Sequence, residues 1–142
     1  IDVRSRRAVR RIESFELLGQ RSDGLNLHSV GALVIDVRAQ RNGGDGIHLV
    51  ARGGRLVNVE VLENAGAGIR AFASDLIAQV RADRNADHGI VVSGARNDLR
   101  SCSANGNSGH GVLLTGRLNL TDGVTTSGNR LSAVAHRGEG RK

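Results

Sequence analysis

Acidic, basic and imidazole side chains recur at two fixed positions around a repeated glycine–aliphatic pair. The position directly before the glycine holds Asp23, Asp45, Ala67, His88 and His110, and the second position after it holds Asn26, His48, Arg70, Val91 and Leu113. An arginine can hold a carboxylate, paired aspartates can bind a hard cation such as calcium, and a histidine can transfer a proton. On one surface, these groups could bind and act on an anionic substrate.

The glycine–aliphatic pair recurs along almost the whole chain. The pairs are Gly24-Leu25, Gly46-Ile47, Gly68-Ile69, Gly89-Ile90 and Gly111-Val112, so their spacings in the numbering are 22, 22, 21 and 22. Four positions before these glycines stand the amide residues Gln20, Asn42, Asn64, Asn85 and Asn107, and Asn129 continues the series. A register kept this long identifies a repeat protein. The residue missing from the one shorter period is expected in a turn.

Within each repeat, apolar residues two positions apart form columns, as expected for strands with one face buried. We extrapolate the column of Leu25 back to Val3 and place Phe15 at the start of another buried column. Three short strands in one period are too few for a propeller blade and suit one coil of a parallel β-solenoid. About six coils, stacked at about 4.8 Å, would give a rod roughly 30 Å long. Stacked amides could form a hydrogen-bonded ladder along it.

The pattern Asn-x-x-x-Gly-[Ile/Val]-x-[Leu/Val] resembles the right-handed parallel β-helix repeat of pectate-lyase-like and related carbohydrate-acting proteins. The resemblance implies an all-β right-handed parallel β-helix filling one domain, residues 1–142. We expect coils near 1–22, 23–44, 45–66, 67–87, 88–109 and 110–131, followed by a partial coil and basic tail at 132–142.

In that family the usual site is the outward face of the strand that begins at each glycine. The resemblance therefore implies candidate catalytic residues Asp45, His48, Arg70 and His88, and candidate substrate-binding residues Asp23, Asn26, Arg70 and His110. Acidic polysaccharide would be the substrate; calcium is a candidate cofactor, and no metal ligands are assigned. Against catalysis, the face becomes apolar at Val91 and Leu113, no Trp or Tyr can stack on a sugar, and no loop walls a cleft. A solvated polar ladder is the alternative interpretation.

The composition limits the classes of molecule that this chain could bind. The net charge is +6, and 19 of the 20 basic residues are arginine, which favours polyanions. Without aromatic platforms or a recognition helix, the sequence argues against nucleic-acid binding. No apolar run approaches the roughly 18 residues of a membrane span. Cys102 falls in an apolar column, so we expect a buried thiol and not a nucleophile.

Three functions remain open. The first is a noncatalytic β-helix module, structural or glycan-binding, of an extracellular or cell-surface protein. The second is the core of a polysaccharide lyase, hydrolase or epimerase, and the third is a self-assembling or engineered repeat scaffold. The regular coils and absent aromatics favour a protein that is not an enzyme. Because no capping element precedes Val3 or follows Val134, we expect end-to-end self-association or a capping partner.

Overall fold

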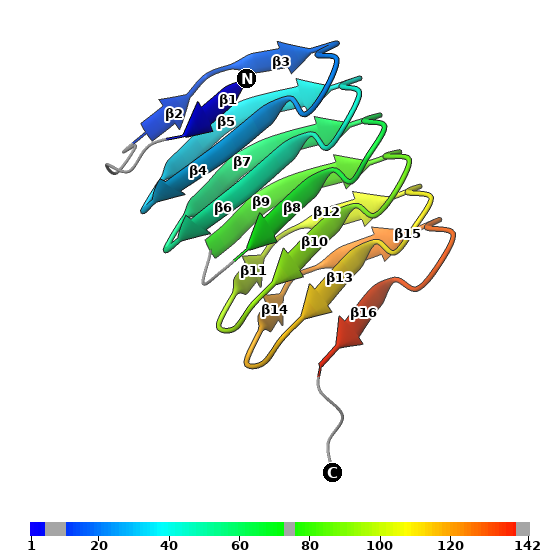
Figure 1. Ribbon diagram of the computed structural model, residues 1–142. Coiled ribbons are helices and arrows are strands. Elements are labelled where there is room, and N and C mark those ends of the chain that lie inside the picture. Colours follow the sequence, from blue (N-terminus) through cyan, green and yellow to red (C-terminus); the bar gives the residue numbers. More distant parts are fainter. Residues whose placement is uncertain (5–10, 73–75, 139–142) are drawn as a thin grey trace.

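In the computed structural model, which describes residues 1–4, 11–72 and 76–138, the chain forms strands of two parallel sheets (Figure 1). Sheet A contains, in spatial order, β1 (Asp2–Arg4), β4 (Leu25–Val30), β6 (Ile47–Arg52), β8 (Ile69–Phe72), β10 (Ile90–Ser93), β13 (Val112–Thr115) and β16 (Val134–Arg137). Sheet B contains β14 (Leu120–Asp122), β11 (Asp98–Arg100), β9 (Leu76–Asp83), β7 (Arg55–Leu62), β5 (Leu33–Gln40) and β2 (Arg11–Glu13), with β3 (Glu16–Leu18) beside β5, and β12 (Ser103–Asn105) between β9 and β15 (Thr125–Ser127). The chain alternates between the sheets once per repeat, so the predicted all-β parallel solenoid is confirmed.

The second and third predicted strands of each coil follow each other in sheet B. In the three central coils they join into the eight-residue strands β5, β7 and β9, which bend at Asp36, Asn58 and Gln79. These three residues have φ between 53° and 54°, in the left-handed region that Asp and Asn tolerate best. The bend changes the direction of the strand without interrupting the core column on either side.

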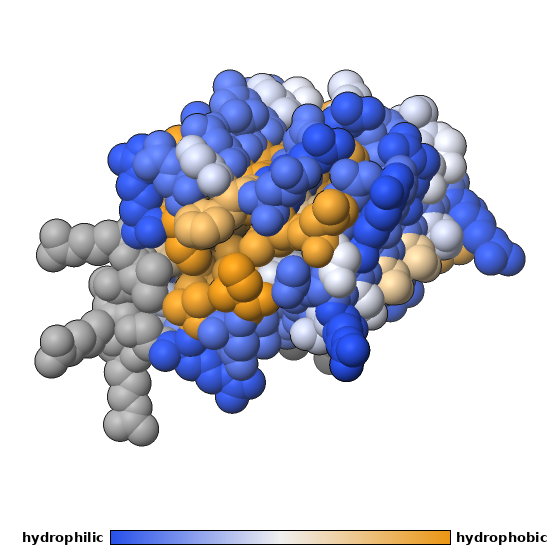
Figure 2. All heavy atoms as spheres, turned by 90° about the horizontal axis from the view of Figure 1, so that it is seen from above, coloured by the Kyte–Doolittle hydropathy of each residue, from blue (hydrophilic) through white to orange (hydrophobic). Residues whose placement is uncertain are grey.

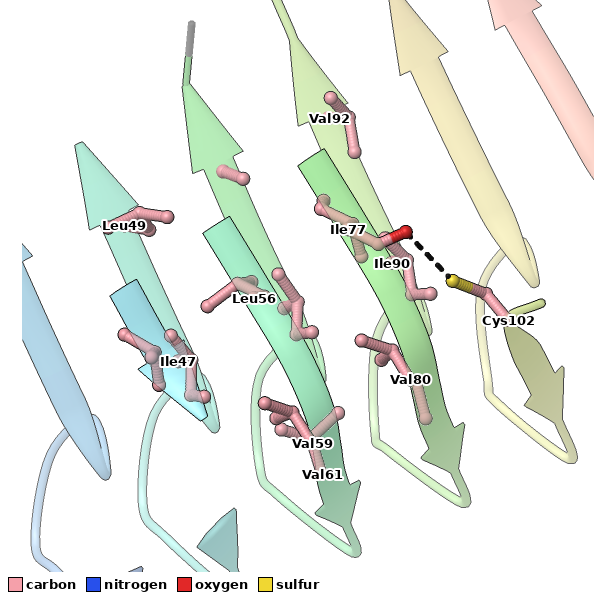
Figure 3. Packing of buried hydrophobic residues seen from close by; sticks show 14 of the residues in the cluster. Ile47, Leu49, Leu56, Val59, Val61, Ile77, Val80, Ile90, Val92 and Cys102 are labelled. Carbon is pink, nitrogen blue, oxygen red and sulfur yellow. Dashed lines mark hydrogen bonds between the residues drawn. The ribbon is translucent and has the colours of Figure 1, made fainter. Parts of the chain in front are cut away.

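The apolar columns meet between the two sheets. Figure 3 shows Ile47 and Ile90 of sheet A beside Leu56 and Ile77 of sheet B, and all four are fully buried. Cys102 belongs to this core as expected, and its Sγ donates to the carbonyl of Ile77 at 3.4 Å. Burial raises the pKa of the Cys102 thiol, which keeps it protonated and unreactive at neutral pH.

The amide column forms the predicted ladder at the turn that precedes each sheet A strand. Asn42, Asn64, Asn85 and Asn107 are buried, and the Oδ1 of each accepts the backbone N–H of the amide residue one coil earlier, at 2.9–3.1 Å. The Nδ2 of each donates both to a core-strand carbonyl and to the next Oδ1. The ladder thus satisfies backbone groups that the turns would otherwise leave buried and unpaired.

The register places the residue missing from the shorter coil between Phe72 and Leu76. Val50 pairs with Phe72 and Arg55 pairs with Leu76, so five residue steps in one coil match four in the next. Whether the missing residue belongs to a turn, as expected, concerns residues 73–75, which lie outside those that the structure describes.

Two assignments at the N-terminal end were wrong. Val3 pairs with Leu27 and not with Leu25, because the paired positions of the first coil lie further apart in sequence than one regular period. Phe15 does lie in register with the core column, but its side chain is 51% exposed because no other described strand covers β2 and β3 on that side. Figure 2 looks onto this end and shows an apolar surface. It contains a hollow of about 130 Å³ lined by Ile1, Val3, Ile12, Phe15, Leu17 and Leu25. End-to-end association stays a prediction.

None of the described residues belongs to a helix long and apolar enough to cross a membrane.

Candidate functional site

The predicted site residues lie along one edge and the outer face of sheet A. Asn26, His48 and Arg70 are neighbours in register on β4, β6 and β8, and Val91 and Leu113 continue the same row on β10 and β13. Adjacent members of such a row are separated by about 4.8 Å, the spacing of paired strands. The structure thus brings the three polar residues together on one face.

The residues directly before each glycine form a second ladder, parallel to the asparagine ladder. Each of their four polar side chains, all but that of Ala67, accepts a hydrogen bond from a backbone N–H one coil further along. The four bonds run from Asp45 N to Asp23 Oδ1 (2.7 Å), Ala67 N to Asp45 Oδ1 (2.7 Å), His110 N to His88 Nδ1 (2.8 Å), and Ser132 N to His110 Nδ1 (3.1 Å). One acceptor atom of each of these four side chains is therefore already bound to the backbone, and the second oxygens of Asp23 and Asp45 face His48 and Arg70.

Arg70 is held by two carboxylates. Its Nε donates to Asp45 Oδ2 at 2.8 Å, and its Nη2 lies 3.4 Å from Asp87 Oδ2. The hydrogen bond to Asp45 is the main reason that the pKa of Arg70 is raised above its usual value. A substrate carboxylate would have to compete with both aspartates for this guanidinium.

Asp87 is a site residue that the sequence interpretation missed. It stands one position before His88, in a column that otherwise reads Ser22, Gly44, Gly66 and Gly109. Asp87 could have been identified from the sequence as the single carboxylate in a column of small residues. Asp87 Oδ1 also lies 3.5 Å from His88 Nε2.

At the other end of the row, His48 lies beside Asp23, with 3.6 Å between Nδ1 and Oδ2. Its ring also packs against the rings of His28 and Phe72, at centroid distances of 6.1 and 5.7 Å. The side-chain oxygen of Asn26 is buried and accepts no hydrogen bond from the described residues. His48 and Arg70 are partners in register, and Asp23 Oδ1 accepts the N–H of Asp45, so the predicted residues form two adjoining ion-paired clusters on one face.

The imidazoles of His88 and His110 stack, with ring centroids 5.1 Å apart and planes 14° from parallel. The pKa of His88 is lowered, mainly because burial penalises the charged ring; His110, Arg70 and Arg137 add to the effect, whereas Asp87 opposes it. The hydrogen bond from His110 N to His88 Nδ1 also requires an unprotonated Nδ1. Both observations indicate a neutral His88 in the folded protein.

This geometry predicts that the free energy of unfolding decreases in mild acid. Because the pKa of His88 is lower in the folded than in the unfolded chain, the unfolded chain binds the proton more readily. The contribution is complete above about pH 6.5 and is lost as the pH falls through the folded-state value, with a slope below about 1.4 kcal/mol per pH unit for one proton. Urea unfolding of wild type and His88→Asn between pH 7.5 and pH 5, roughly the range in which histidine titrates, measures this slope.

His88→Asn keeps an acceptor for His110 N and removes the titrating ring, so its stability should depend less on pH than that of wild type. His136→Gln, which removes an exposed imidazole, serves as the control and should retain the wild-type slope. Equal slopes for wild type and His88→Asn would contradict the assignment.

Beyond Arg70 the face becomes apolar, as the sequence indicated. Ala67, Val91 and Leu113 are buried together with Ala135 packed against them. No cluster of three or more His, Cys, Asp or Glu that could hold a metal ion occurs within residues 1–4, 11–72 and 76–138. The side chains of this site therefore accept hydrogen bonds from backbone N–H groups, and their charges are neutralised by ion pairs within the protein. The site continues into an apolar surface.

Comparison with known proteins addresses the fold. A crystal structure of HetL, a pentapeptide repeat protein involved in heterocyst differentiation regulation from the cyanobacterium Nostoc sp. strain PCC 7120, aligns over 89% of this chain and 86% of its own, at 12% identity and a TM-score of 0.23. A search of curated proteins finds no match. The family model described as "Right handed beta helix region" matches residues 3–138, a span that contains the core columns and both ladders. The chain therefore belongs to the right-handed β-helix family.

Proposed function

We propose that this chain is a noncatalytic, structural β-helix module. The observation that carries the proposal is the ladder before the glycines, in which Asp23, Asp45, His88 and His110 each accept a backbone N–H from the next coil. A general base needs a lone pair that reaches the substrate proton. In this ladder one acceptor atom of each side chain stabilises a turn instead, and Asp45 Oδ2 is bound to Arg70.

The ion pairs support the same conclusion. Arg70 is bound by Asp45 and Asp87, so the group best suited to hold an acidic sugar is neutralised within the protein. The neighbouring residues Val91 and Leu113 are buried apolar side chains that offer no polar contact to a sugar. These features support a rod whose polar edge stabilises the stack of coils.

The test is an NMR time course of the protein with a panel of acidic polysaccharides, with and without calcium. We expect no new anomeric or unsaturated-uronate signals. New signals that disappear in both Asp45→Asn and Arg70→Gln would overturn the proposal and favour the polysaccharide-acting alternative. Broadening of polysaccharide lines without new signals, again abolished by Arg70→Gln, would favour glycan binding at this face. His136→Gln, at an exposed position away from the two clusters, is the matched control.

A further inference from the structure

A second surface, on the sheet B side, has a different character from the site described above. A hollow of about 360 Å³ is lined by Gly53, Gly54, Arg55, Leu76, Arg96, Asp98 and Arg100. Arg55 begins β7, Leu76 begins β9, and Asp98 and Arg100 belong to β11, so three successive coils contribute. None of these residues was a candidate from the sequence.

The hollow lies where the middle coil has an irregular length. Arg55, Leu76 and Asp98 are partners in register at the start of their strands. From Phe72 to Leu76 the middle coil has four residue steps, whereas its neighbours have five, from Val50 to Arg55 and from Ser93 to Asp98. The neighbouring coils supply Gly53, Gly54 and Arg96 to the walls, and the described part of the middle coil supplies Leu76.

The charges around the hollow are unbalanced. Among the residues that the structure describes, three arginines and one aspartate line it, and Asp98 is bound to Arg100, whose Nε and Nη2 donate to Asp98 Oδ2 at 2.9 and 2.7 Å. Within the described part of the chain, the guanidinium groups of Arg55 and Arg96 form no ion pair. Other arginines of the solenoid do have carboxylate partners: Arg38, Arg41, Arg70, Arg81 and Arg84.

We propose that this hollow binds a tetrahedral oxyanion, a phosphate or sulfate group that is either free or carried on a polymer. Arginine guanidinium groups bind such oxygens through paired, charge-assisted hydrogen bonds. Arg55 and Arg96 line the hollow from coils on opposite sides of Leu76, and Arg100, bound to Asp98, completes the wall. The volume lies at the small end of the range for ligand pockets, roughly 300–1,000 Å³, as suits a small anionic group.

The experiment follows the arginine Nε–Hε resonances by NMR during titration with sodium sulfate, with sodium chloride at matched ionic strength as reference. We expect saturable shifts for Arg55 and Arg96 that chloride does not reproduce. The double variant Arg55→Gln/Arg96→Gln should weaken sulfate binding by about tenfold or more, since each lost charge-assisted hydrogen bond contributes on the order of a factor of ten. Arg130→Gln, an exposed arginine of another coil, should leave it unchanged.

Two further titrations, with inorganic phosphate and with dextran sulfate, distinguish a free anion from one carried on a polymer. Inorganic phosphate should compete with sulfate for the same resonances. If dextran sulfate binds wild type more tightly than sulfate does, and the double variant loses this difference in affinity, the anion is carried on a polymer. Equal affinities of dextran sulfate and sulfate would indicate a free anion. The proposal is overturned if sulfate shifts all exposed arginines alike, if Arg130→Gln weakens binding as much as the double variant, or if sulfate has no effect beyond that of chloride. The wild-type shifts decide the matter even if the double variant does not fold.

Discussion

Replacement of Asn85 by alanine should lower the free energy of unfolding by about 4 kcal/mol, because several buried polar groups lose their partners at about 1–3 kcal/mol each. Asn85 Oδ1 accepts from both the backbone N and the Nδ2 of Asn64, and its own Nδ2 donates to the carbonyl of Val61 and to Asn107 Oδ1. The loss would be a large part of a typical total stability of about 5–15 kcal/mol. Urea denaturation followed by circular dichroism measures it.

The same column offers a matched control. Gln20 stands at the exposed end of the ladder, where its side chain donates one weak hydrogen bond to the carbonyl of Leu18 at 3.3 Å, while its backbone N–H still binds Asn42 Oδ1. Gln20→Ala should therefore cost less than about 1 kcal/mol, as expected for a surface side chain. Similar losses for Asn85→Ala and Gln20→Ala would show that the ladder does not stabilise the stack.

Replacement of Gly68 by alanine should destabilise the protein by about 3 kcal/mol or more, at or beyond the usual cost of overpacking a core. An added Cβ would lie 2.6 Å from the carbonyl oxygen of Gly89 and 2.8 Å from both Asn85 Nδ2 and Val61 Cγ2. The carbonyl cannot move away without breaking its hydrogen bond from Ile69 N, which joins two coils. Thermal and urea unfolding would both report the loss.

Gly31 is the matched control for this substitution. A Cβ at Gly31 meets nothing within 4 Å, but its φ of 64° lies in the left-handed region. Gly31→Ala should cost only the backbone strain, about 1–2 kcal/mol. If Gly68→Ala is no more costly than Gly31→Ala, the close approach of neighbouring coils at the glycine column is not a constraint.

The ladder residues also show where sequence interpretation stopped. Asp45 and His88 occupy equivalent positions on different coils, and residue type alone suggested a base or a metal ligand. Their acceptor atoms face backbone N–H groups at 2.7 and 2.8 Å. The direction of a lone pair depends on the rotamer and on the turn geometry, and neither is visible in residue spacing. Asp87 was missed because its role depends on the reach of Arg70 from another strand.

The sequence by itself determined the architecture. In a parallel stack each residue lies beside its equivalent one period away. The spacing of the repeat in the sequence therefore tells which residues are in contact in the structure. The buried columns, the asparagine ladder and the position of Cys102 followed from that identity. The placement of Val3 was wrong because the spacing changes in the first coil, where the repeat no longer sets the pairing.

Only the tertiary structure decided what the polar residues do. It paired Arg70 with carboxylates of two coils, and it placed Arg55 and Arg96 around Leu76 with no carboxylate of their own among the described residues. The physical reason is that an arginine is neutralised or available according to which long side chains reach it across neighbouring coils. Such reach depends on side-chain direction and turn length, which the periodic pattern does not contain.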